Sequence, residues 1–303
     1  MSRPKISIII LTHNGIKDHL GKTLKAVFSQ KLKDGFEVIA IDSESTDRTI
    51  SLLKKYPAVR IKEIKKSEFG HGKTRRLGAE MAKGQLVVFL TQDATPADKH
   101  WLKNITKNFQ DPEVVGVCGR VLPRKNAFLL KKIEVDNDLS GRKEKIIAQI
   151  KNQAEFDKLS FYEKRLNYYF FNDVSSCVRK DYLLSKPAID IAFAEDVEFA
   201  KIALADGKKI IFEPESKVFH SHDYSLLKTY RRNFIDSEYH TKHLGIKNVP
   251  TIKCLLANTK HQVRRDLEQI DSYNPSFIDK TKALMYSPVI HFAEQLGQYK
   301  GTK

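Results

Sequence analysis

Acidic residues at three places in the chain follow apolar segments and could do chemistry. Asp42 and Asp93 each come at the end of an apolar run, and the pair Glu195-Asp196 follows the segment IAFA. A carboxylate in such a loop can accept hydrogen bonds from a ribose or a base, bind Mg²⁺ or Mn²⁺, or act as a general base. Turn formation and helix-dipole complementation are the ordinary alternatives. We favour ligand binding for Asp42 and metal binding for Asp93, and both explanations stay open for the pair.

Residues 67–76 (SEFGHGKTRR) form a basic segment suited to an anion. Gly72-Lys73-Thr74 resembles the end of a phosphate-binding P-loop, but that motif needs glycine where Ser67 stands, which argues against an ATPase. A diphosphate could still be held at a helix start by the basic side chains of the segment, which are His71, Lys73, Arg75 and Arg76.

Two further polar segments have open interpretations. Residues 12–15 (THNG) could bind a base or ribose, although Asn-Gly taken alone is better explained by a turn. In the segment His220-Ser221-His222, one histidine could be an additional metal ligand or an ordinary hydrogen-bonding residue. Alternate residues of a strand face opposite ways, so both histidines could bind one metal only if the strand has already ended.

Alternating strands and helices must position these segments. Apolar runs rich in β-branched residues predict strands at 5–11, 36–41, 59–64, 85–90 and 114–121. Helices are predicted at 19–30, 46–55 and 74–83, and Ser45 or Thr46 is expected to cap the second, with Asp47 in its first turn. This alternation predicts right-handed βαβ crossovers and a mostly parallel sheet, whose carboxyl edge collects the polar loops.

The rest of the chain has a different pattern. Residues 124–171 predict a long, charged, helical region. A strand at 173–179, a helix at 195–206 and a strand at 209–212 follow. Beyond Asp223 lies a mostly helical tail, so we expect two domains, at residues 1–224 and 225–303.

Composition limits the class of protein. The 303 residues include 41% apolar and 30% charged residues, which excludes a disordered or fibrous chain. Lys and Arg number 53 against 37 Asp and Glu, and the net charge of +16 points to an anionic partner. The three cysteines fit neither a zinc spacing nor a disulfide framework. Without a signal peptide or a spanning segment, we expect a cytoplasmic protein, with attachment at the inner face of the cell membrane as a further expectation.

Taken in order, six motifs resemble those of the inverting family 2 glycosyltransferases, over residues 5–225. They are the THN loop, the DSESTD loop, FGHGKTRR, FLTQDATP, AED and VFHSHDYS. Family membership implies an α/β GT-A fold, here with a helical C-terminal extension, and transfer of a sugar from a nucleotide diphosphate. The GHGKTR, TQDA and HSHxYS segments are most similar to the bacterial rhamnosyltransferase branch, whose usual donor is dTDP-L-rhamnose.

The resemblance also implies roles for individual residues. Asp196 would be the catalytic base with Glu195 as its companion, and Asp93 would bind the metal with His220 as a further ligand. Thr12 and Asp42 would contact the base and ribose, and Arg75 or Arg76 the phosphates. The whole donor site is expected to comprise Thr12, Asn14, Asp42, Ser43, His71, Lys73, Arg75, Arg76, Gln92 and Asp93.

The sequence departs from the family pattern at two positions. The metal-binding motif reads Gln92-Asp93-Ala94, with a single carboxylate, which lowers the expected metal affinity. Arg76 stands where the branch commonly has Asn, which adds charge near the expected diphosphate.

The expected activity is therefore transfer of a sugar to a glycan acceptor in bacterial surface polysaccharide assembly. A UDP- or GDP-linked donor and a non-catalytic nucleotide-sugar-binding subunit are the alternatives. A nucleic-acid-binding protein is disfavoured, because no recognition motif accompanies the charge. Basic and aromatic residues of the tail suit a lipid-linked glycan or an anionic membrane, and they are Lys228, Tyr230, Arg231, Arg232 and Phe234.

Overall fold

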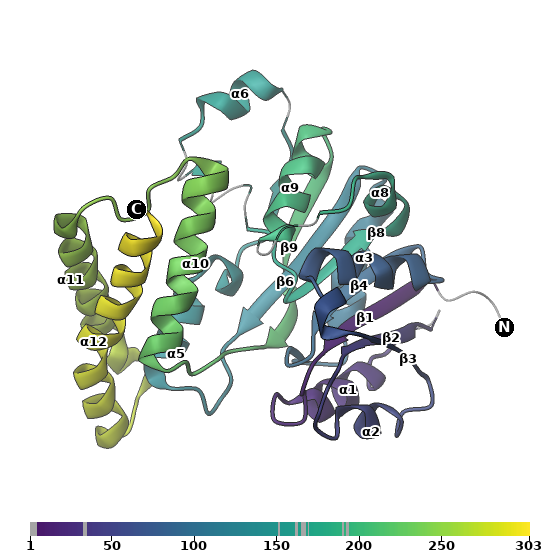
Figure 1. The fold of residues 1–303 in the computed structure, drawn as a ribbon, viewed down its shortest axis with the longest axis horizontal. Helices are drawn as coiled ribbons and strands as arrows, with labels where there is room; N and C mark the ends of the chain where they lie inside the picture. The colour runs from purple at the N-terminus through teal and green to yellow at the C-terminus, as the bar shows by residue number, and fades with distance from the viewer. Residues whose placement is uncertain are drawn as a thin grey trace. The chain divides into compact units, whose positions relative to one another are not determined.

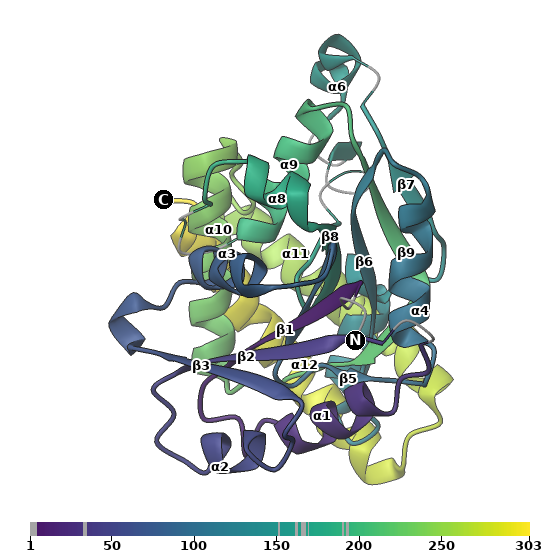
Figure 2. The same ribbon diagram turned by 90° about the vertical axis from the view of Figure 1, so that its right-hand side faces the viewer.

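The computed structural model describes residues 5–32, 35–150, 152–160, 163–164, 168, 170–189, 191 and 194–303. The chain forms two compact units, each of which is described by itself. The first comprises residues 1–122 and 138–220, and the second comprises residues 123–137 and 221–303. Figure 1 labels most helices and strands of both units, and Figure 2 also labels α4, β5 and β7.

The described strands of the first unit form one sheet in the order β3-β2-β1-β4-β8-β6-β9-β5, with β7 paired to β9. The strands are β1 (Ile6–Thr12), β2 (Glu37–Ser43), β3 (Val59–Ile64), β4 (Leu86–Thr91), β5 (Thr95–Pro96), β6 (Val114–Leu122), β7 (Ile146–Ala148), β8 (Ser175–Arg179) and β9 (Lys209–Phe219). Neighbouring strands from β3 to β4 are parallel, as are β6 and β9, while β8 runs antiparallel to both β4 and β6. The α/β class and the mostly parallel sheet are therefore confirmed.

Helices cover both faces of this sheet, which explains why its strands are continuous apolar runs. Ile8, Ile9 and Ile10 of β1 are consecutive and all buried. Figure 2 shows α3 and α9 on the opposite side of the sheet from α4. The helices of this unit are α1 (Leu20–Phe28), α2 (Thr49–Leu53), α3 (His71–Met81), α4 (Trp101–Thr106), α6 (Gln153–Lys158), α8 (Lys180–Ser185) and α9 (Glu195–Ala205).

Helix α2 is shorter than the sequence predicts. It begins at Thr49 after Arg48, without a side-chain cap, instead of at Thr46. The Ser45 hydroxyl donates to Asp42, and the Thr46 amide donates to Asn14. The predicted capping by Ser45 or Thr46 is therefore wrong, because Ser45 bonds to β2 and Thr46 bonds to the loop after β1.

The segment after Arg124 was expected to be one helical region, and this expectation is also wrong. Its described part contains α5 (Leu129–Asn137), a 3₁₀ turn at Leu139–Gly141, the strand β7 and the short α6. The predicted strand at 209–212 is longer and continues to Phe219, with a register shift opposite Gly119 and Arg120. Pro214 obscures this strand in the sequence, and the irregular pairing accommodates it.

The second unit is helical. It contains α5, α10 (Leu226–Leu244), α11 (Ile252–Gln269) and α12 (Phe277–Gly301), and Figure 1 shows α10, α11 and α12 running alongside one another. Glycine permits the close approach of α12 to α10, because a Cβ at Gly301 would lie 2.3 Å from the carbonyl oxygen of Phe234. The expected second domain comprised residues 225–303. The observed unit also includes residues 221–224 and the segment 123–137 with α5, whose Ile133 packs with Ile270 and Ala283.

A buried ionic group links α11 to α12. His291 contacts Asp266 through Nε2 at 2.6 Å and Glu294 through Nδ1 at 2.7 Å, and the Ser287 hydroxyl also donates to Asp266. Burial lowers the pKa of His291, but the hydrogen bonds to the two carboxylates outweigh it and raise the pKa to about 9. The imidazolium therefore neutralises Asp266 inside the helical unit at neutral pH.

Candidate active site

The ends of β1 and β2 place two predicted donor-site residues side by side. Thr12 is paired with Asp42 in the sheet register, both are buried, and the Thr12 hydroxyl donates to Asp42 Oδ2 at 2.8 Å. The backbone amide and the hydroxyl of Ser45 donate to the same carboxylate at 2.8 and 2.6 Å. Asp42 therefore organises the loop after β2, and any contact with a ligand would use its remaining lone pairs.

Polar side chains connect this loop to its neighbours. Asn14 has φ 49°, so it does make the turn that its position after the first strand suggested. Its side-chain oxygen also accepts a hydrogen bond from the Thr46 amide at 2.8 Å. From the loop after β4, Gln92 accepts from the amide of His13 at 2.9 Å and donates to its carbonyl at 3.1 Å. Ser43 donates to the Thr12 carbonyl at 3.3 Å. The structure therefore brings Thr12, Asn14, Asp42, Ser43 and Gln92 together at one edge of the sheet.

The basic segment forms the start of α3, and its cations fall into two groups. His71 and Lys73 in the first turn are exposed. Arg76 instead donates to the carbonyls of Lys186 and Leu184 at 2.8 and 3.1 Å, which joins α3 to the end of α8. These bonds give Arg76 a structural use that the sequence did not suggest.

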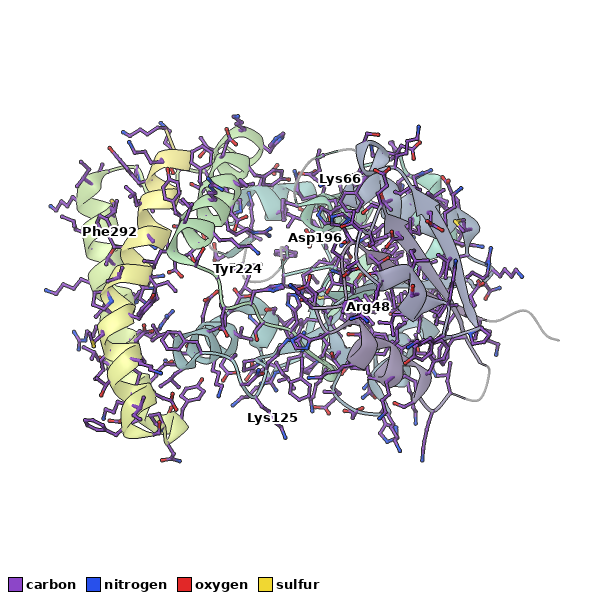
Figure 3. The ribbon with its side chains drawn as sticks, turned by 60° about the horizontal axis from the view of Figure 1, so that its bottom comes forward. Arg48, Lys66, Lys125, Asp196, Tyr224 and Phe292 are labelled. Carbon is purple, nitrogen blue, oxygen red and sulfur yellow. The ribbon has the colours of Figure 1, made fainter. Side chains whose placement is uncertain are left out.

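Arg75 lies at the centre of a cluster of carboxylates. Its Nε is 3.3 Å from Asp173 Oδ2, and its NH1 donates to Glu195 Oε1. Asp196 joins through Oδ2, which accepts a hydrogen bond from the backbone N–H of Asp173 at 3.2 Å. Arg75 and Asp173 are buried, whereas Glu195 and Asp196 are half-buried at the start of α9. Figure 3 labels Asp196. Breaking a buried ion pair costs about 3–5 kcal/mol, so Arg75 is held in this cluster.

This environment disfavours ionisation of two of the acids. Burial, followed by the negative charges of Asp173 and Glu195, raises the pKa of Asp196 to about 7 against the opposing effect of Arg75. Burial is also the main cause of the raised pKa of Asp173. A small cavity of about 40 Å³ borders Arg75, Asp173 and Glu195, and apolar side chains such as Phe89 and Phe199 line its other side. A half-buried carboxylate with a pKa near 7 is suited to general base catalysis.

Asp173 is the member of this cluster that the sequence analysis missed. It was expected only as the first residue of a strand, whereas β8 begins at Ser175 and the Asp173 carboxylate accepts a hydrogen bond from Ser176. A signal was present, because an acid directly before a fully buried strand has to find a partner. The partner, Arg75, is 98 positions earlier, and only the folded chain identifies it.

Asp93 and His220 are brought together by a short strand pairing. Strand β5 pairs antiparallel with the end of β9, with Thr95 opposite Phe219. As a result, His220 Nε2 lies 3.4 Å from Asp93 Oδ2. Because β9 ends at Phe219, the alternation of side chains along a strand no longer constrains His220. His222 belongs to the second unit. A carboxylate oxygen and an imidazole nitrogen are both groups that bind divalent metal ions, and here they lie within reach of one ion.

Comparisons with known proteins bear on this geometry. The family model described as Glycosyl transferase family 2 matches residues 7–174. The O-antigen chain rhamnosyltransferase RfbN of Salmonella typhimurium is 30% identical over 239 residues, which are 78% of this chain and 72% of that protein. The O-antigen chain rhamnosyltransferase WbaN of Salmonella anatum is 31% identical over 241 residues, with the same shares.

Among solved structures, the chain is similar to the mannosyltransferase PcManGT from Pyrobaculum calidifontis, determined in complex with GDP-Man and Mn²⁺. The TM-score is 0.59 at 17% identity, covering 98% of this chain and 88% of that one. At this identity the likeness bears on the fold alone, and it supports the GT-A architecture.

The raised pKa of Asp196 predicts how stability depends on pH. Because its pKa is raised in the folded state, Asp196 contributes to the free energy of unfolding in full below pH ~4. This contribution is lost as the pH rises toward 7. Asp196→Asn should therefore raise the melting temperature relative to wild type, by an amount that grows between pH 4 and 7 in thermal unfolding measurements.

Asp206 at the other end of α9 provides a control of opposite sign. Its hydrogen bonds with Lys186 and Tyr182 hold the pKa of Asp206 below its usual range. Asp206→Asn should therefore cost stability above pH 4. A melting-temperature difference for Asp196→Asn that does not change with pH would contradict the raised pKa.

Proposed function

This chain belongs to glycosyltransferase family 2, and on that premise we propose that it transfers L-rhamnose from dTDP-L-rhamnose to a glycan acceptor with inversion at the anomeric carbon. The observation that carries the chemistry is the carboxylate of Asp196, whose pKa is about 7 beside Glu195 and Arg75. Two O-antigen rhamnosyltransferases, about 30% identical over 78% of the chain, support the choice of sugar and a role in surface polysaccharide assembly.

The proposed mechanism is a single displacement. An acceptor hydroxyl is a weak nucleophile, so Asp196 removes its proton as the oxygen attacks the anomeric carbon. The bond from that carbon to the diphosphate breaks on the opposite face, which inverts the configuration. Negative charge then develops on the departing nucleoside diphosphate, where nearby cations stabilise it.

We assign the donor contacts according to which groups the fold leaves accessible. His71 and Lys73 would lie along the diphosphate, because both are exposed in the first turn of α3, whereas Arg75 is buried and Arg76 joins α3 to the end of α8. Thr12, Asn14, Asp42, Ser43 and Gln92 form the connected edge that would receive the base and ribose. The surplus of basic residues is consistent with an anionic donor.

A divalent cation fits the pair Asp93 and His220. Asp93 supplies a hard oxygen ligand, whereas the imidazole of His220 is a better ligand for Mn²⁺ than for Mg²⁺. A cation held there would neutralise charge on the diphosphate as it departs. The single carboxylate of the segment Gln92-Asp93-Ala94 suggests modest affinity.

Asp196→Asn separates catalysis from donor binding. A screen of dTDP-, UDP- and GDP-linked sugars by thermal shift should show the largest stabilisation with dTDP-L-rhamnose, because a ligand that binds the native state raises its melting temperature. Asp196→Asn should keep that shift and lose transfer by at least about 10²-fold.

Each alternative has its own outcome in the same experiment. Transfer at the wild-type rate by Asp196→Asn would overturn the assignment of the base. The largest shift with a UDP- or GDP-sugar would replace the donor, and donor binding without release of nucleoside diphosphate would indicate a non-catalytic subunit.

The metal proposal is tested by Asp93→Asn. Mn²⁺ should enhance the thermal shift that dTDP-L-rhamnose gives with the wild type, and both EDTA and Asp93→Asn should remove that enhancement. The matched control is Asp98→Asn, since Asp98 is an exposed acid five residues after Asp93, beyond β5, and accepts a hydrogen bond from the His100 amide. Donor affinity that is indifferent to EDTA and to Asp93→Asn would refute the metal site.

We further propose that the second unit docks on an anionic membrane that carries a lipid-linked glycan acceptor. Among the described residues, no helix is long and apolar enough to cross a membrane. One face of α12 nevertheless exposes large apolar side chains at helical spacing, which are Ile278, Met285, Val289 and Phe292 (Figure 3 labels the last). The neighbouring α11 adds exposed Leu256 beside Lys253 and Lys260. Exposed apolar and basic groups together are typical of an interfacial helix.

Flotation with lipid vesicles tests this docking. The wild type should float with vesicles that contain phosphatidylglycerol and less with pure phosphatidylcholine. The double variant Met285→Ser, Phe292→Ser should lose this binding. Ile147→Ser, which replaces an exposed apolar residue of the first unit, should keep it. A wild type that fails to float with either vesicle would contradict the proposal.

A further inference from the structure

Three carboxylates in the first unit depend on one guanidinium. Asp173 comes from the segment before β8, Glu195 and Asp196 come from the start of α9, and Arg75 comes from α3. Fully ionised, this group would carry three negative charges against one positive charge. Little exposed surface is left to screen them, since the side chains of Arg75, Asp173 and Glu195 are only 10%, 9% and 11% exposed. Ionisation of any one acid therefore depends on the other two.

Asp173 contacts both the cation and the proposed base. Its carboxylate lies against Arg75 Nε, and its backbone N–H donates to Asp196 Oδ2 at 3.2 Å. The Ser176 hydroxyl donates to Asp173 Oδ1, which orients the carboxylate. Asp173 therefore affects Asp196 in two ways, because its amide holds the carboxylate in place and its charge competes for Arg75.

Three other groups interact with the cluster. From α3, His71 lowers the pKa of Asp173. From β6, Cys118 is buried and stays neutral, because burial raises the pKa of its thiol. From α9, the Val197 amide donates to Asp196 Oδ1 at 2.8 Å, a bond that the backbone keeps in any side-chain variant. Asp173 is thus the described carboxylate that can be neutralised without changing the Glu195-Asp196 pair itself.

We infer that Asp173 is a positioning residue for the base: its backbone amide orients the Asp196 carboxylate, and its own carboxylate shares Arg75 with the Glu195-Asp196 pair. This inference rests on the proposed function only in that Asp196 is the base. The consequence for catalysis is base strength, since a carboxylate that binds its proton more tightly removes one from a hydroxyl more effectively.

Asp173→Asn separates the two effects, because asparagine keeps the backbone amide but loses the charge. Its single oxygen can still accept from Arg75, and its NH2 group can donate to the Ser176 hydroxyl, which accepts as well as donates. Release of dTDP from dTDP-L-rhamnose, with a synthetic octyl glycoside as the acceptor, is measured from pH 5 to 9. In the pH profile of kcat/KM, the acid limb should move to lower pH by about one unit or more. The plateau of kcat should fall by roughly 3-fold for each unit of that shift, with the KM for the donor unchanged.

Two further variants keep the test decisive. Asp206→Asn is the matched control at the other end of α9 and should leave the acid limb at its wild-type position. If Asp173→Asn fails to fold, Ser176→Ala replaces it. Loss of the hydroxyl removes a hydrogen bond that stabilises the ionised form of Asp173. The acid limb of the pH profile should therefore still move to lower pH, by a smaller amount than in Asp173→Asn. A folded variant of either position whose limb coincides with that of the wild type would overturn the inference.

A measurement without turnover distinguishes this inference from the proposed function. The melting temperature of the wild type should fall between pH 4 and 7. The fall should be smaller for Asp173→Asn, because fewer like charges then oppose the ionisation of Asp196. A wild type that releases no dTDP would refute the proposed function and leave this second readout valid. An unchanged dependence of melting temperature on pH would refute the role of Asp173 whatever the activity.

Discussion

One guanidinium, that of Arg75, determines how the first unit can be arranged around its acids. It binds Asp173 and Glu195 directly and stands close to Asp196, so α3, the entry to β8 and the start of α9 must converge on one point. Unpaired buried carboxylates would cost several kcal/mol each, and that cost makes the convergence specific. Burial, together with the imbalance of one cation against three anions, raises the pKa of Asp196 to about 7. Stability and proposed catalysis thus depend on the same charges, because Arg75 holds the acids together and partly offsets the burial and the like charges that disfavour ionisation of the base.

The polar edge of the sheet follows a different constraint. Its loops are joined by short hydrogen bonds in which Asp42 binds Thr12 and Ser45, and Asn14 binds Thr46. These bonds remove the freedom of loops that would otherwise have to be ordered by a ligand, which favours binding through preorganisation. Asp93 and His220 are joined in a similar way, by the pairing of β5 with the end of β9. A family 2 glycosyltransferase built like this presents its donor-site candidates from loops that the sheet already holds in register.

Much of the fold could be predicted because it is local. Runs such as KISIIIL and QLVVFL have the composition of strands buried on both faces, and α9 begins at Glu195 as its pattern indicates. The predictions for α2 and for residues 124–171 were wrong for a shared reason. Ser45 and Thr46 have capping propensity but bond to neighbouring loops, and helix-forming residues near 146 form a strand because β9 offers them an edge. Local propensity loses wherever a tertiary partner satisfies the same groups better.

By itself, the sequence determined the class of fold, the order of the polar loops and which residue types stand at the carboxyl edge of the sheet, because hydrophobic period and strand order are properties of neighbouring residues. The assignment of donor-site residues remains a proposal. Only the tertiary structure decided that Arg75 serves carboxylates, that Arg76 joins α3 to α8, and that Asp173 belongs with Asp196. These partners are separated by 23 to 120 positions. Charge and burial act through space, so the ionisation of an acid depends on neighbours that its own segment does not contain.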